Sequence, residues 1–295
     1  MDTPTIDLNV CRVRIFSTIV RTLLSGYGGE TLDTTLSQTA ALSRRERYLL
    51  VLPLLGSAFV GLFLLLAPTL LAALTGYSGN DLYVYRLCGA ATIGYPIALG
   101  LGLRQNNWSS LRLVVLAFFV FGLGSLYACF ADIITGNARP VVYVVLALTL
   151  IFAAITGSTL ALRQTPKAVP DIAAWVVALL IVATLLATTF GLLPLFLPSV
   201  FGHTMGLKAT DIFIYRQAGA ATVGYAVMGI FELRSRNWQE MRWPVVMAMV
   251  FNAVSFLSGL LAFITHDWSI LLYLTCPVTL LITGALLLAL RRGGQ

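Results

Sequence analysis

Charged residues and the residues of ordinary catalytic chemistry are scarce in this chain. Only 11% of its 295 residues are charged and two are histidines. The four cysteines have no CxxC spacing, which argues against a redox pair or a zinc site. No glycine-rich phosphate loop follows a strand, and no nucleophile stands beside a base. These absences predict a protein that is not an enzyme and that holds no metal and no cofactor.

Apolar residues are what the chain has in abundance. They make up 58% of the sequence, and the mean hydropathy is +0.89, far above what a soluble chain needs to fill a core. A transmembrane helix needs roughly 20 apolar residues in a row. Eight stretches qualify, at about 48–75, 83–103, 111–133, 141–162, 172–200, 212–231, 243–264 and 269–290. Because the stretches are long and solidly apolar, they predict an all-α, multi-pass bundle of eight transmembrane helices and not a barrel.

The basic residues alternate in number between the segments that join these stretches. Twelve fall on one predicted side: Arg44, Arg45, Arg47, Arg104, Arg112, Arg163, Lys167, Arg234, Arg236, Arg242, Arg291 and Arg292. Only Arg139 and Lys208 fall on the other. Basic residues near span ends stay in the cytoplasm, so we expect a cell-membrane protein with both termini cytoplasmic. The net charge of +7 is spread over five segments, which favours membrane lipids as partners over nucleic acid.

The two halves of the chain resemble each other. Residues 81–95 read DLYVYRLCGAATIGY and residues 211–225 read DIFIYRQAGAATVGY, with nine of 15 positions identical at an offset of 130. The offset also pairs other residues, among them Gly61 with Gly191, Pro68 with Pro198 and Arg112 with Arg242. Four spans per half is an even number, so the sequence predicts two parallel four-helix repeats, at 48–163 and 172–292.

The remaining segments are short. Residues 164–171 contain two prolines and are predicted to link the repeats. Residues 1–47 form a cytoplasmic N-terminal segment in which apolar residues recur at helical spacing over 13–23. Two interpretations stay open for this segment, an amphipathic helix on the membrane surface and a disordered leader.

Charged residues inside a predicted span are the first candidates for a site. Arg86 and Arg216 lie a few residues inside the second and sixth spans, each on one face with small residues. Asp81 and Asp211 occupy the expected N-cap positions of these spans, and Asp132 ends the third. The arginines either form buried ion pairs, for example Arg86 with Asp132, or make the two anion-binding ends of a cavity between the halves.

Aromatic residues repeat beside these charges. The tyrosines that are candidates for lining such a cavity are Tyr85, Tyr95, Tyr215 and Tyr225. Interhelical hydrogen bonds explain them nearly as well. Trp108 and Trp238 stand beside Asn among arginines and are interpreted as anchors at the cytoplasmic membrane surface.

Two further features distinguish the second half. Its third span carries Asn252, Ser255 and Ser258, where the first half offers only Gly122 and Ser125, so any pathway would be asymmetric. Glu232 and Glu240 flank the loop at 234–239, and we expect both to pair with the arginines of that loop or with Arg242, just beyond it.

The segment YRxxGAATxGY of each half resembles the DoxX-like families of small four-helix membrane proteins. The resemblance implies a duplicated four-helix unit and at most an accessory link to redox complexes, and it transfers no catalytic residue. The function that we expect is a non-catalytic membrane subunit or scaffold that contacts lipids or other membrane proteins. The alternative is a small permease with an anion-attracting site between the repeats, and an intramembrane enzyme comes third. The apolar middle of nearly every span favours the scaffold.

Overall fold

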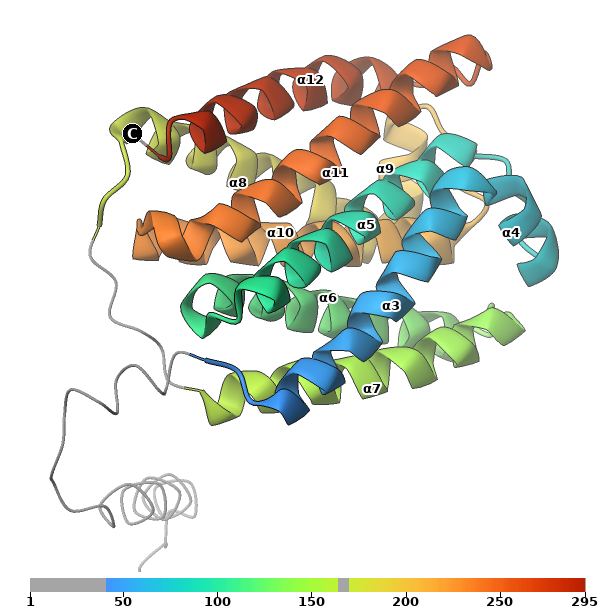
Figure 1. Ribbon diagram of the computed structural model, residues 1–295. Coiled ribbons are helices and arrows are strands. Elements are labelled where there is room, and N and C mark those ends of the chain that lie inside the picture. Colours follow the sequence, from blue (N-terminus) through green and yellow to red (C-terminus); the bar gives the residue numbers. More distant parts are fainter. Residues whose placement is uncertain (1–40, 164–169, 295) are drawn as a thin grey trace, which may run out of the picture. The chain divides into compact units, whose positions relative to one another are not determined.

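The computed structural model describes residues 41–163 and 170–294, and within these residues α-helices joined by loops make up all of the regular secondary structure (Figure 1). The predictions for the N-terminal segment and for most of the linker fall on residues 1–40 and 164–169, which lie outside the described residues. In chain order the helices are α3 (Arg44–Leu66), α4 (Pro68–Thr75), α5 (Leu82–Gln105), α6 (Trp108–Ile134), α7 (Pro140–Leu162), α8 (Ala174–Phe196), α9 (Pro198–Thr204), α10 (Ile212–Ser235), α11 (Trp238–Ile264) and α12 (Ile270–Arg291).

Seven of these helices are long and apolar enough to cross a membrane, which confirms a multi-pass membrane protein. They are α3, α5, α6, α7, α8, α11 and α12. The predicted span at 212–231 corresponds to α10, which is not among the seven. It has 24 residues but carries Arg216, Glu232 and Arg234.

Two predicted spans are each broken by a proline. The stretch at 48–75 divides into α3 and α4 at Pro68, and the stretch at 172–200 divides into α8 and α9 at Pro198. Proline has no backbone N–H and its ring clashes with the preceding turn, so it begins a new helix in both places. The first helix also starts earlier than expected, because Ser43 and Glu46 form a capping box that places the first arginines inside α3.

The long helices form an inner and an outer set. Among the inner helices, α5 packs against α3 and α11, while α10 packs against α8 and α6. The outer helices α7 and α12 pack against α6 and α11. Within their most apolar windows, 72% of α5 is buried but only 17–28% of α3, α7, α8 and α12. Thus the second long helix of each half packs against the third long helix of the other half, which makes the halves interlock.

Ion pairs join the helices at the arginine-rich end, where α3 begins and α7 ends. The Arg163 guanidinium donates to the Glu46 carboxylate with Nε and Oε1 2.9 Å apart. Arg112 of α6 lies 3.1 Å from the Glu240 carboxylate of α11. The expected partners of Glu240 were the arginines close to it in sequence, so this prediction was wrong. The interlocked packing brings α6 beside α11 and supplies Arg112 instead.

Candidate functional site

The opposite end of the bundle is held by two aspartates that reach across the halves. Asp211, just before α10, accepts hydrogen bonds from the backbone N–H groups of Ser78 and Gly79, each at 2.8 Å. It also accepts one from the Tyr85 hydroxyl of α5, again at 2.8 Å. A buried carboxylate with this many donors is well satisfied. Asp211 therefore attaches the loop before α5 to the start of α10.

Asp81 makes the same contacts in the other direction. Its carboxylate accepts from the backbone N–H groups of Lys208 and Ala209, at 3.0 and 3.1 Å, and from the Tyr215 hydroxyl at 2.8 Å. Both aspartates occupy the predicted N-cap positions, but neither side chain caps its own helix. The predicted side-chain capping was therefore wrong, because the interlocked halves offer each aspartate its donors in a loop and a helix of the other half.

The two intrahelical arginines are not equivalent. Arg216 pairs with Asp132, the residue that we expected to pair with Arg86. The predicted pair of Arg86 and Asp132 was wrong because α10, which carries Arg216, runs along α6, whereas α5 does not. Nε and Nη1 of Arg86 are buried and have no hydrogen-bond partner among the described residues. The surroundings of the two arginines in the described chain are therefore not symmetric.

Tyr77, in the loop between α4 and α5, lies at the same end. Its ring stacks on Phe213 with the centroids 6.1 Å apart, and its hydroxyl is buried without a partner among the described residues. Burial, with a smaller effect of the Asp132 carboxylate, raises the pKa of Tyr77 above its ordinary value. The hydroxyl therefore stays protonated throughout the physiological pH range.

Tyr95 and Tyr225 cross at the centre of the molecule. The Tyr95 hydroxyl of α5 donates to the Ala221 carbonyl of α10 at 2.6 Å, and the Tyr225 hydroxyl donates to the Ala91 carbonyl of α5 at 2.8 Å. The two rings meet edge to face with centroids 5.1 Å apart. Both hydroxyls are thus used between helices, as the structural interpretation of these tyrosines anticipated.

The glycine that precedes each tyrosine is required for this arrangement. A Cβ atom on Gly94 would overlap the Tyr225 hydroxyl and lie 2.8 Å from the Met247 carbonyl oxygen. A Cβ atom on Gly224 would overlap the Tyr95 hydroxyl and lie 2.7 Å from the Ala117 carbonyl oxygen. The GY pair of each half is explained by this contact, which we call the tyrosine crossing.

The two tryptophans have different surroundings. Trp108 is only 3% exposed and belongs to the apolar core around α5 and α6. Its indole therefore packs on protein, where an anchor at the lipid head groups was expected. Trp238 is half-buried and lies against Gly294 near the end of the chain.

A hollow in the described part of the chain lies among α8, α10, α11 and α12, and it is also lined by Val84 and Leu87 of α5 and by Phe201 of α9. This cavity has a volume of about 290 Å³, and its walls are almost entirely apolar. Along α10 its lining extends from Tyr215 to Glu232, which are 17 residues apart, or roughly 25 Å at 1.5 Å per residue. The cavity is therefore long and narrow, and it ends near the arginine-rich end of the bundle.

Glu232 is the acidic residue in the cavity wall. It is only 3% exposed, and its Oε1 atom is buried with no hydrogen-bond partner among the described residues. We expected it to pair with loop arginines, but it forms no ion pair there, because Arg234 and Arg236 are exposed while Glu232 faces inward. A buried polar group without a partner is costly. This carboxyl group was missed as a site residue by the sequence analysis.

Ser255 adds a second unpartnered polar atom to the same wall. It is fully buried and its Oγ has no hydrogen-bond partner in the described chain. Asn252, one turn earlier on α11, also lines the cavity and donates to the Ala248 carbonyl at 2.8 Å. The extra polar residues of the third span in the second half were the one sequence signal that pointed toward this cavity.

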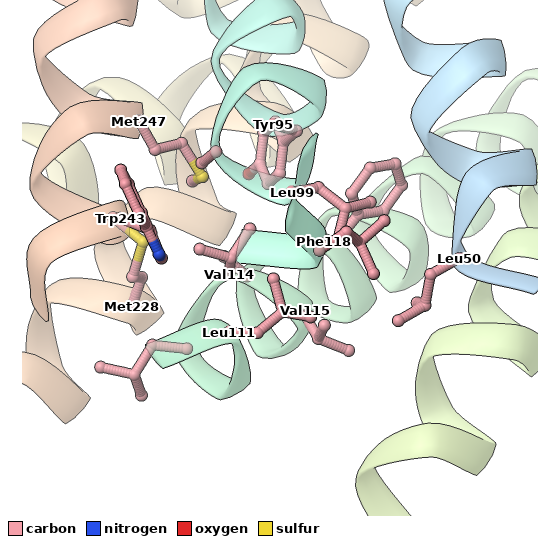
Figure 2. Close-up of a cluster of buried hydrophobic side chains, with 14 of the residues drawn as sticks. Leu50, Tyr95, Leu99, Leu111, Val114, Val115, Phe118, Met228, Trp243 and Met247 are labelled. Atoms are coloured by element: carbon pink, nitrogen blue, oxygen red, sulfur yellow. The ribbon is translucent and has the colours of Figure 1, made fainter. Parts of the chain in front are cut away.

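The corresponding space among α3, α5, α6 and α7 is filled with side chains. Phe118 lies with its ring centroid 5.3 Å from that of Tyr95 and 6.3 Å from that of Phe152. Figure 2 shows Phe118 beside Leu99, with Leu50 of α3 on the far side. The residue 130 positions after Phe118 is Ala248, in the wall of the cavity.

Polar residues also differ between the two spaces, as Ser125 and its counterpart in the cavity wall show. The Ser125 hydroxyl of α6 donates to Gln217 Oε1 at 2.8 Å and lies 3.2 Å from the Thr149 hydroxyl. Its counterpart 130 positions later is the unpartnered Ser255. The counterpart of Glu232 is Gly102, where a Cβ atom would overlap Leu111. A position-by-position comparison of the halves therefore singles out Glu232 and Ser255.

The candidate sites described above rest on the contacts within this chain and not on similarity to known proteins. The resemblance to DoxX-like families stays a prediction. No family model matches the chain, and neither a curated protein nor a solved structure matches it.

Proposed function

We propose that the protein is a non-catalytic membrane subunit or scaffold with eight transmembrane helices in two parallel four-helix repeats. In this proposal α10 is the eighth span, the repeats cover 48–163 and 172–292, and both termini are cytoplasmic. The reciprocal contacts of Asp81 and Asp211 and of Tyr95 and Tyr225 support the repeat, because each pair relates equivalent positions of the two halves.

The low hydropathy of α10 is compatible with a span. An inner helix contacts protein on most of its surface, so it does not need an apolar face all round. Helices α8, α6 and α5 surround α10. Arg216 is neutralised by Asp132, and Arg234 lies in the last turn, where it can reach the lipid head groups. The burial of Glu232 is the one feature of α10 that this argument leaves without a structural purpose.

The observation that carries the scaffold proposal is the tyrosine crossing. It fills the centre of the bundle with two packed rings and two satisfied hydroxyls, where a permease needs a polar cavity open to water. It also ties α5 of one half to α10 of the other with hydrogen bonds in both directions. A fixed contact of this kind is expected in a rigid scaffold, whereas the halves of a permease must move relative to each other.

The permease alternative loses much of its support. Its anion site needed both Arg86 and Arg216, but Arg216 is paired with Asp132. Its four tyrosines needed free hydroxyls, but each of the four donates to an aspartate or a carbonyl oxygen. Arg86 keeps two buried donors without a partner in the described chain, Nε and Nη1, and Arg216 keeps one, Nε.

Cysteine accessibility in whole cells tests the proposal. Single cysteines at Ala91 and Ala221, beside the tyrosine crossing, are placed in a background without native cysteines and treated with a membrane-impermeant maleimide. We expect no labelling from either side. Asn137 and Gln239, which are exposed at opposite ends, serve as controls. Position 137 should label in intact cells, and position 239 only after permeabilisation.

Labelling at position 91 or 221 from alternate sides would favour a permease and overturn the scaffold. Labelling of position 239 in intact cells would overturn the proposed orientation. Because a folding defect would also expose these positions, each variant is first checked by size-exclusion chromatography and thermal unfolding.

A further inference from the structure

We propose that the cavity among α8, α10, α11 and α12 binds one amphiphile from the membrane, with its apolar chain along the cavity and its head group at Glu232. The head group is a hydrogen-bond donor, an amine or a hydroxyl. This ligand site goes beyond the scaffold proposal and does not depend on it.

The carboxyl group of Glu232 determines the chemistry of the head group. Its Oε1 atom is buried at the cavity wall and has no donor among the described residues, although Arg234 and Arg236 are close in sequence. A carboxyl group that is left buried in this way is satisfied by a donor from a ligand, and best by a cationic one. A carboxylate head group has no N–H or O–H donor to offer to Oε1, and it repels Glu232 whenever Glu232 is ionised. The site therefore selects amines and alcohols over fatty acids.

The walls determine the body of the ligand. Apart from Glu232 and a few hydroxyl and amide groups, they consist of aliphatic and aromatic side chains, and a volume of about 290 Å³ lies at the lower limit for small-molecule sites. The length of roughly 25 Å along α10 matches an extended chain lying across most of the hydrocarbon core. We infer that a single chain fits and that a lipid with two chains does not.

The exposed residues of the cavity lining indicate the source of the ligand. Helices α8 and α12 flank the cavity but barely touch each other. Four lining residues of these two helices are partly or well exposed: Leu186 and Ala187 of α8, and Leu274 and Val278 of α12. These are apolar faces that lie toward lipid in a membrane protein. An amphiphile thus reaches the cavity sideways from the bilayer.

The filled space in the other half supports a ligand role for the cavity. Two phenylalanines, Phe118 and Phe152, occupy that space, and Gly102 stands where the second half has Glu232. Both a buried acid and an empty volume are destabilising on their own. Their combination in one half only is explained if a ligand supplies the missing volume and the missing donor.

Binding of three matched amphiphiles tests the proposal. Dodecylamine, dodecanol and dodecanoate share one chain and differ in the head group. They are added to the purified full-length protein in a nonionic detergent, and bound copies are counted by native mass spectrometry. We expect one copy of the amine or the alcohol, and binding of dodecanoate that is weaker by about tenfold or more. The order of amine and alcohol identifies which of the two head groups the site prefers.

Three variants locate the binding. Glu232→Leu should abolish the preference for amine and alcohol over dodecanoate. Ala248→Phe, which introduces the side chain found at 118, should abolish binding of all three. Leu281→Phe, on the exposed face of α12, should change neither result. If Ala248→Phe fails to fold, Thr279→Phe narrows the same cavity from α12 and replaces it.

The proposal is overturned if Glu232→Leu keeps the head-group preference, or if both cavity-filling variants bind as well as the wild type. It is also overturned if none of the three amphiphiles binds to the delipidated protein.

Discussion

Two groups of four helices in this protein have similar arrangements and different interiors. In the filled group, formed by α3, α5, α6 and α7, aromatic side chains close the centre. In the cavity group, formed by α8, α10, α11 and α12, a long hollow remains. The contacts that bind the two groups to each other are reciprocal, while the side chains inside each group are not. The tyrosine contacts between the groups are therefore symmetric, whereas the packing inside them is not.

The difference rests on few positions. Phe118 and Gly102 of the filled group stand opposite Ala248 and Glu232 of the cavity group, at the offset of 130. The first substitution removes volume and the second adds a buried acid. Natural proteins place few unsatisfied polar groups in their interior, and those that occur require an explanation. We find that explanation in ligand binding, because neither change stabilises the fold.

The largest effect is expected from opening the filled group. Phe118→Ala removes a buried ring and leaves a void that its neighbours fill only in part, so the free energy of unfolding should fall by about 3 kcal/mol or more. Thermal unfolding in detergent measures the change. Phe130→Ala, on a well-exposed face of α6, is the matched control and should cost far less. Equal losses in the two variants would mean that the filled group is not tightly packed.

The second-largest effect is expected at the tyrosine crossing, which joins the two groups. Gly94→Ala forces the Tyr225 hydroxyl and the Met247 carbonyl away from α5, which should lower the free energy of unfolding by about 1–3 kcal/mol. Gly100→Ala on the same helix meets only Leu54, at 3.5 Å, so it should be neutral or slightly stabilising. If Gly94→Ala unfolds at the wild-type temperature, the tyrosine crossing does not stabilise the bundle.

The third prediction concerns two glutamates whose replacement by leucine should change the free energy of unfolding in opposite directions. Glu232→Leu removes an unpartnered buried acid, so the ligand-free protein should gain about 1 kcal/mol or more. Glu240→Leu should destabilise the protein, because it leaves the half-buried guanidinium of Arg112 without its carboxylate. Unfolding of both variants after delipidation measures the contrast. A loss of stability in Glu232→Leu would indicate that Glu232 has a structural partner.

The smallest effect compares two serines at equivalent positions. Ser125→Ala breaks hydrogen bonds to Gln217 and Thr149 and should cost about 1 kcal/mol. Ser255→Ala removes a hydroxyl that has no partner in the described chain, and its cost should be close to zero. Unfolding curves recorded side by side separate the two variants. Similar losses of stability in the two variants would show that Ser255, like Ser125, forms a stabilising hydrogen bond.

Much of the architecture is readable from the sequence. Hydropathy alone predicts a helical multi-pass membrane protein, and the structure confirms it. The helix breaks at Pro68 and Pro198 were also present in the sequence, as a matched pair of prolines inside apolar runs. They were missed because hydropathy continues through a proline while the helix does not.

Partners across the halves were not predictable in the same way. Asp132 pairs with Arg216 and Glu240 with Arg112 because α6 runs between α10 and α11, and no local pattern encodes that arrangement. The inward direction of Glu232 is likewise a property of the packing, since the neighbouring Arg234 and Arg236 face outward. The similarity of the two halves of the sequence identifies which residues correspond, whereas the cavity depends on the positions at which the halves differ.

Photochemical mapping of a bound amphiphile tests this asymmetry most directly. A long-chain amine with a diazirine in its chain is added to the protein in lipid nanodiscs, irradiated, and located by peptide mass spectrometry. The account predicts labelling of cavity residues in α8, α10, α11 and α12, and loss of that labelling in Ala248→Phe. Equal labelling of α6 and α7, or labelling that Ala248→Phe leaves unchanged, would contradict a ligand site formed mainly by the second half.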